Sequence, residues 1–307
     1  MTETERHMSV EKPRADDVFL DSHEAMDAVF GIALVGEVEG YARGFATECW
    51  RMLDRLEEEL SRFVPYSDIS RINRLDRGER VTVGPAAFEC LVTARRLYTE
   101  TYGAFDVTMG TGPLNRSGGP NAPESSRPPR PFPLELDESN HTAGLTEDGV
   151  TVDLGGIGKG FALDRLRRLL EEWSIEDAIL HSSESTILPC GVPPDSRKRW
   201  SVTLRHPDSG ETLARLYLGG RAGSGSGAER VGPHIVDPRT GEYELPRRGA
   251  WALAPHATTA DALSTAFTVM SRDEVEAFCE DHPDVTALLQ SDNGLVVRGR
   301  ECDLEVL

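Results

Sequence analysis

The 307-residue chain has few cysteines, few basic residues and no long apolar segment, and each absence excludes a class of protein. The odd number of cysteines and the lack of a C-x-x-C pair argue against a disulfide scaffold and a structural zinc site. No segment approaches the roughly 18 apolar residues that a membrane-spanning helix needs, and no signal peptide or lipobox is visible. We therefore expect a chain of a reduced compartment, cytoplasmic and without a membrane segment. The cysteines are Cys49, Cys90, Cys190, Cys279 and Cys302.

Positive charge is scarce: 33 Lys and Arg residues stand against 52 Asp and Glu residues, for a net charge of −19. The phosphates of a nucleic acid would be repelled by so acidic a surface, so we expect no nucleic-acid partner. Solubility or halophilic adaptation explains the acidity equally well, and it says little about a substrate.

Two common nucleotide-binding signatures are also absent from the glycine-rich segment at 153–164, which reads D-L-G-G-I-G-K-G-F-A-L-D. A Walker A loop needs Ser or Thr after its lysine, whereas Gly160 follows Lys159 here. A dinucleotide fingerprint needs G-x-G-x-x-G after an early strand, whereas these glycines lie in mid-chain. The segment is therefore a glycine turn of another kind.

The order of the expected elements predicts an α+β fold of mixed sheets packed with helices. Residues 1–22 are charged and aperiodic and are expected to form a mobile, disordered tail, followed by a single domain over 23–307. Pro, Gly and Ser dominate 115–133, which predicts a flexible loop. Helices are expected near 42–60, 87–98, 160–173 and 259–270, with a capping box at Ser271 and Glu274. Strands are expected near 28–35, 81–83, 150–154, 177–181, 200–205, 212–218, 249–254, 285–290 and 294–298.

Two segments carry the chemistry that the sequence indicates. The glycine turn at 155–160 lets backbone groups approach a phosphate or a metal closely, because no Cβ atoms intervene. The segment A-D-A-L-S-T-A at 260–266 places Asp261 and Thr265 four residues apart, on one face of a helix. A carboxylate and a hydroxyl stacked in this way suit a hard cation such as Mg²⁺. Together the segments predict a metal–pyrophosphate site.

Five motifs in register resemble one family, the FAD:protein FMN transferases of the ApbE family. The resemblance covers roughly residues 25–290, and implies an ApbE-like (T-fold-like) fold. Its segments are L-S-R-F-V-P-Y-S-D-I-S-R-I-N at 60–73, G-A-F-D-V-T at 103–108, the glycine-rich segment at 153–164, H-I-V-D-P-R-T-G at 234–241 and A-D-A-L-S-T-A at 260–266.

The resemblance implies an enzyme that binds FAD with Mg²⁺, attaches FMN to a Ser or Thr hydroxyl of a partner flavoprotein and releases AMP. A side activity as an FAD pyrophosphatase is also implied. Asp261, Thr265 and the carbonyl of Gly156 would bind the metal, and His234 would be the catalytic base. The implied flavin-nucleotide contacts are Met26, Phe63, Ala104, Phe105, Asp106, Asp153, Lys159 and Ile235.

The chain departs from the family pattern at three places. Met26-Asp27-Ala28 stands where the family has M-G-T, so a carboxylate replaces a glycine near the phosphates. Ser182-Ser183-Glu184-Ser185 replaces a G-G-D or G-G-N turn, and the segment from Ser224 to Arg230 lacks the family's tyrosine. These changes leave an alternative open: a degenerate family member that binds flavin without transfer, as a carrier or sensor. A scaffold that retains only the fold is a third possibility.

Each site residue also has a purely structural interpretation. Asp261 would favour a helix dipole, and Thr265 would bond back to a helical carbonyl. Asp153 would cap the following helix and Asp106 would form a turn. Lys159 would be a solvated lysine, and His234 a strand-edge histidine.

Overall fold

An eight-stranded antiparallel sheet forms the centre of the computed structural model, which describes residues 8–10, 18–109, 131–183, 185–194, 199–206, 209–227, 236–241, 249–291 and 294–306. Alternate residues of its central strands enter different cores: Leu180 and Leu188 face one side, and Ile179 and Ile187 the other. Both faces are therefore covered. In spatial order the strands are β14 (Gly294–Gly299), β13 (Thr286–Ser291), β12 (Gly249–Ala254), β11 (Ala222–Gly227), β8 (Thr186–Cys190), β7 (Ala178–Ser182), β3 (Ala28–Val35) and β2 (Val18–Ala25).

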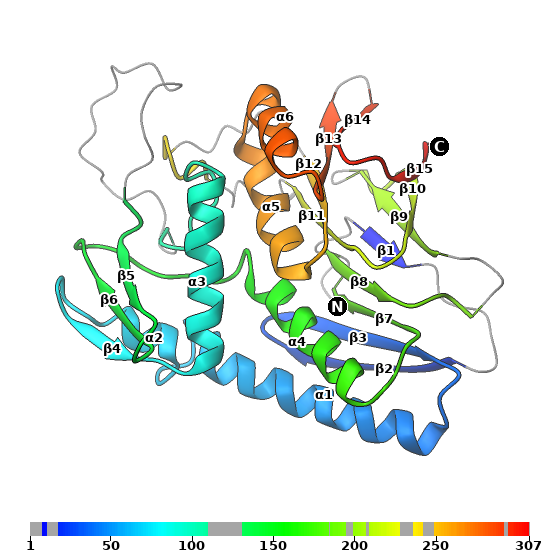
Figure 1. Cartoon of the computed structure of the whole chain (residues 1–307), viewed down its shortest axis with the longest axis horizontal. Coiled ribbons are helices and arrows are strands. Elements are labelled where there is room, and N and C mark those ends of the chain that lie inside the picture. The colour runs from blue at the N-terminus through cyan, green and yellow to red at the C-terminus, as the bar shows by residue number, and fades with distance from the viewer. Residues whose placement is uncertain are drawn as a thin grey trace.

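Helices cover one face of this sheet, with α1, α4 and α5 beside it and α3 farther out (Figure 1). The first is α1, Glu39–Leu60, and its buried residues recur every three or four positions, as the sequence predicts. The other helices are α2 (Asp68–Ile72), α3 (Pro85–Glu100), α4 (Gly158–Glu172), α5 (Ala257–Val269) and α6 (Arg272–Asp281). The predicted capping box at the start of α6 is confirmed, with Ser271 and Glu274 bonding each other's backbone N–H groups.

A second antiparallel sheet covers the opposite face of the large sheet. It contains Trp200, which packs with Trp251 of the large sheet in a core distinct from the helical one. A third, three-stranded sheet lies beside α2 and α3 (Figure 1). The second sheet has the order β1 (Met8–Val10), β9 (Trp200–Arg205), β10 (Thr212–Leu218), β15 (Asp303–Val306), and the third β4 (Arg80–Thr82), β6 (Thr142–Leu145), β5 (Leu134–Asp137).

The expectation of a mobile tail over residues 1–22 is wrong where the structure describes this segment. Met8–Val10 is β1, and Val18–Ala25 pairs with β3 over its whole length. A turn at Met26 and Asp27 closes the β2–β3 hairpin, so local pairing orders residues whose charge indicated a tail.

The strand expected at 150–154 is also absent, since only an isolated bridge joins Thr151 to Met109 there. The backbone of Val152 bonds instead to the side chain of Asn73, with N–O distances of 2.9 and 2.7 Å. Of the loop predicted at 115–133, residues 115–130 lie outside the described residues. No helix of the described part of the chain combines the length and apolarity needed to cross a membrane.

Candidate functional site

The glycine turn precedes α4 and is pressed against the start of α5. A Cβ added to Gly160 would lie only 2.2 Å from the carbonyl oxygen of Ala257 and 2.8 Å from Cβ of Asp261. Only glycine therefore allows α4 and α5 to approach so closely at this end. This contact brings Asp261, distant in sequence, to the turn.

The three predicted metal-binding residues meet at this contact. A Cβ on Gly156 would lie 3.5 Å from Oγ1 of Thr265 and 3.3 Å from the ring of Phe105. The Gly160 N–H donates to Oδ2 of Asp261 at 2.9 Å. Asp261 is 4% exposed, and Thr265 is half-buried. The separation of about one hundred residues between the two motifs is thus closed by the packing of α4 on α5.

The two helices cap each other, which fixes this geometry. Asp261 of α5 accepts from the third residue of α4, while Asp164 of α4 accepts from the first N–H groups of α5. Asp164 bonds the N–H groups of Ala257 and Thr258 at 3.0 and 2.9 Å and the Thr258 hydroxyl at 2.6 Å. Neither helix has a side-chain cap of its own at its N-cap residue. Asp164 ends the glycine-rich motif, but sequence reasoning assigned it no role.

The oxygen atoms here suit a hard cation. A carboxylate, a hydroxyl and a nearby backbone segment leave several coordination positions for phosphate oxygens and water. In the described ranges no group of three or more His, Cys, Asp and Glu residues could hold a metal. The described ranges therefore contain no zinc-type site, whereas the oxygen donors of Asp261, Thr265 and the glycine turn fit Mg²⁺.

Several predicted flavin contacts lie around the turn. The Met26 methyl group would be 3.1 Å from a Cβ on Gly158. The ring of Phe63 is 76% exposed, and Lys159 Nζ donates to the Gly155 carbonyl at 3.2 Å. Asp153 bonds the Gly155 N–H at 2.9 Å, so it shapes the turn itself.

Arg62, which sequence reasoning did not single out, joins two of these residues. Its Nε lies 2.9 Å from Oδ2 of Asp153, and its guanidinium lies over the Phe63 ring, 4.3 Å from the centroid. Arg62 and Asp153 therefore form an ion pair beside the glycine turn, where Lys159 carries a further positive charge.

The G-A-F-D-V-T segment packs beneath the turn. Ala104 and Phe105 are buried, and Phe105 contacts the glycine turn through its ring. Asp106 accepts bonds from the N–H and hydroxyl of Thr108 at 2.8 and 2.5 Å, which is the turn-forming role expected of it. In this structure the segment supports the turn from inside.

The predicted base His234 and its neighbour Ile235 lie outside the described residues. The chain on both sides of them is tied to α5. Before them, Ser226 bonds Thr265; after them, Arg239 pairs with Asp237 and donates to the Val269 carbonyl.

Two of the three departures from the family pattern lie side by side. Met26 and Asp27 have φ values of 54° and 57°, and Ser183 has 48°, a left-handed conformation that is costly for residues other than glycine. The Ser183 N–H donates to the Val29 carbonyl, which joins the tips of the β2–β3 and β7–β8 hairpins. His181, beside this tip, packs its ring against Gly31, and burial lowers its pKa.

The cysteines are not part of the site. Burial raises the pKa of Cys190 and Cys279 to about 11, and Cys49 and Cys90 are fully buried. These surroundings suit small apolar residues and not reactive thiolates.

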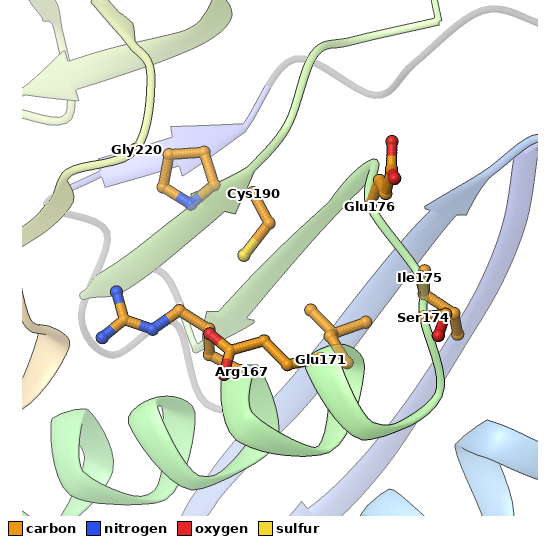
Figure 2. A pocket seen from close by; sticks show the side chains of 9 residues that line it. Arg167, Glu171, Ser174, Ile175, Glu176, Cys190 and Gly220 are labelled. Atoms are coloured by element: carbon orange, nitrogen blue, oxygen red, sulfur yellow. The ribbon is translucent and has the colours of Figure 1, made fainter.

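A separate hollow of about 550 Å³ opens at the C-terminal half of α4 (Figure 2). Arg167, Glu171 and Cys190 line it, and it contains none of the predicted site residues. Arg167 is already bonded to the Pro255 carbonyl and the ring of His256. The predicted metal-binding residues lie instead at the N-terminal end of α4.

Comparison with known proteins decides the family. A model described as the ApbE family matches residues 26–289. The chain belongs to the ApbE family. The fold class predicted from the motifs, an ApbE-like α+β fold, is confirmed by solved structures of this family.

Curated ApbE-family relatives are distant but match over most of their length. A protein named FAD:protein FMN transferase from Chlamydia muridarum is 27% identical over 244 residues, or 72% of this chain and 74% of that protein. One of the same name from Haemophilus influenzae is 27% identical over 276 residues, or 80% of this chain and 79% of that protein.

Solved structures agree over nearly the whole chain. The flavin transferase ApbE from Vibrio cholerae superposes with a TM-score of 0.75 at 22% identity, covering 92% of this chain and 98% of that one. The ApbE protein from Thermotoga maritima gives a TM-score of 0.75 at 25% identity, covering 92% of this chain and 97% of that one.

Proposed function

We propose that this chain is a Mg²⁺-dependent FAD:protein FMN transferase. The single observation that carries the proposal is the convergence of Gly156, Asp261 and Thr265 at the start of α4. The relatives named FAD:protein FMN transferase support the same activity.

In this proposal the diphosphate of FAD lies against the glycine turn. The N-terminus of α4 provides a favourable helix dipole for an anion. Asp261, Thr265 and the Gly156 carbonyl would hold Mg²⁺, which neutralises charge on the phosphoryl oxygens during transfer. Lys159 adds positive charge at the same end, where it donates to the Gly155 carbonyl.

The reaction breaks the phosphoanhydride bond of FAD and forms a phosphoester bond with the acceptor. The oxygen of a Ser or Thr hydroxyl on the acceptor flavoprotein bonds to the phosphorus of the FMN half, and the bond from that phosphorus to the AMP half breaks. AMP leaves with the bridging oxygen, and a base takes the hydroxyl proton. We assign this base to His234, because a histidine titrating near neutrality suits the transfer. With water in place of the acceptor, the products are FMN and AMP.

The experiment measures AMP release from FAD with and without Mg²⁺, in the presence of a flavoprotein domain that carries a Ser or Thr acceptor. We expect metal-dependent AMP release and flavin that stays on the denatured acceptor. Unlabelled acceptor and unchanged FAD would contradict the proposal.

A second candidate function is flavin binding without transfer. The left-handed turn at Met26 and Asp27, joined to the altered hairpin at Ser183, favours it because Met26 lies against Gly158 of the glycine turn. Bound FAD that remains intact for hours with Mg²⁺ present would support a carrier or sensor, whereas turnover would exclude it.

A further inference from the structure

Four hydroxyl side chains lie between the large sheet and α5, beside the predicted metal-binding residues. We call them the hydroxyl cluster: Thr186 of β8, Ser224 and Ser226 of β11, and Ser264 of α5. Thr186, Ser224 and Ser264 are fully buried. A buried hydroxyl is costly unless it is hydrogen-bonded, so the partners of these side chains indicate what they do.

One half of the cluster holds the carboxylate of Asp261. Thr186 and Ser224 both lie within donating distance of Oδ1, at 3.2 and 3.3 Å, and 2.9 Å from each other. The Gly160 N–H donates to the other oxygen, Oδ2. A carboxylate oxygen has about two lone-pair sites. The two hydroxyl protons serve Oδ1 and the contact between Thr186 and Ser224, so at least one hydroxyl donates to Oδ1, while Oδ2 keeps one site for a further partner.

The other half of the cluster holds Thr265. Its hydroxyl lies 3.3 Å from Oγ of Ser226, which lies 2.8 Å from Oγ of Ser264. Ser264 in turn donates to the backbone carbonyl of Asp261 at 2.8 Å. The Thr265 proton is directed either to Ser226 or to the Asp261 carbonyl, which lies 3.5 Å away. With either acceptor, the oxygen lone pairs of Thr265 are available to a cation.

We propose that the hydroxyl cluster positions both side-chain ligands of the cation, leaving Oδ2 of Asp261 and the hydroxyl oxygen of Thr265 as the binding atoms. This inference rests on the proposed function, because it concerns the same metal. Thr186 and Ser226 are positioning residues, since they act through Asp261 and Thr265. Partners of metal ligands of this kind typically affect metal affinity by 10- to 100-fold.

The test measures direct binding of Mn²⁺ to the purified full chain. The electron paramagnetic resonance signal of Mn²⁺ that stays free in solution is the readout. Thr186→Val removes the hydroxyl and keeps the β-branched shape, whereas Thr186→Ser keeps the hydroxyl. The matched control is Thr286→Val, because Thr286 is fully buried in the same sheet and donates to the Arg300 carbonyl at 2.7 Å, away from Asp261.

We expect Thr186→Val to weaken Mn²⁺ binding about 10-fold. Thr186→Ser should restore affinity to within about two-fold of the wild type, and Thr286→Val should leave it unchanged. Ser226→Ala should weaken binding through Thr265.

A purely structural role for the cluster predicts a different result. Thr186→Val and Thr286→Val would then both lower the unfolding midpoint, and both variants would bind Mn²⁺ with wild-type affinity. That outcome, with Asp261→Asn still abolishing Mn²⁺ binding, overturns the positioning role and keeps the proposed function. Wild-type affinity in Asp261→Asn would instead contradict the proposed metal site itself.

Discussion

The centre of the candidate site and its rim are held in different ways. The centre consists of Gly156, Asp261 and Thr265, packed between helices and bonded to buried hydroxyls. The rim includes Met26 and Phe63, which lie on turns at the surface. The motif of the centre is intact, whereas two of the three departures from the family pattern, at Asp27 and at Ser183, lie along the rim. The comparison indicates that packing constrains the centre, while the rim has room to change which ligand the site accepts.

The largest effect should come from the centre. We expect Asp261→Asn to lower metal-dependent AMP release by at least about 100-fold, the upper end of the loss seen for partners outside the coordination shell. Asp177→Asn is the matched control, because Asp177 directly precedes β7, at the end of the strand opposite Ser183, and its carboxylate accepts from the Val192 N–H. Equal activity of the two variants would show that Asp261 is a capping residue only.

Asp164 should matter for stability. Asp164→Ala leaves two N–H groups and one hydroxyl of α5 without their partner, so we expect a loss of about 2 kcal/mol in the free energy of unfolding. Urea denaturation measures it. Asp284→Ala removes an exposed pair with Arg300 and should cost less than about 0.5 kcal/mol. If the two variants are equally stable, the mutual capping of α4 and α5 does not hold the centre together.

His181, at the rim, should make stability depend on pH. Burial lowers its pKa in the folded state below the ordinary value of 6.5, so the unfolded chain binds the proton more readily. This contribution to stability is complete above about pH 6.5 and is lost as the pH falls through the folded pKa. His181→Gln should flatten the decline in stability between pH 7 and 5 in urea titrations.

The smallest effect should come from Asp27. Asp27→Gly removes both a charge and the strain of a left-handed residue, so FAD affinity should rise about two- to five-fold, as expected for one exposed charge. Asp27→Asn removes only the charge, so it separates the contribution of the charge from that of the backbone strain. Fluorescence titration with FAD is the measurement. Weaker FAD binding in Asp27→Gly would mean that the turn is adapted to its ligand.

The sequence predicted what depends on local pattern. The helix at Glu39–Leu60 and the capping box at Ser271 follow from periodicity and local side-chain chemistry. The meeting of Gly156 with Asp261 and Thr265 was predicted from the family resemblance, because no local pattern links residues one hundred positions apart.

The structural features that the sequence did not predict have a common physical cause. Val152 reads as a strand residue, but the side chain of Asn73 takes its backbone hydrogen bonds. Thr186 and Ser224 are ordinary polar residues until the sheet places them on Asp261. Such contacts exist only after long-range packing, so a single sequence carries no signal for them.

The most direct test of the account is a crystal of the protein grown with Mn²⁺ and ADP, measured at a wavelength where manganese scatters anomalously. The account predicts one strong peak bounded by Gly156, Asp261 and Thr265, with the ADP phosphates against the glycine turn. Bound ADP with its manganese away from Asp261 and Thr265 would contradict it.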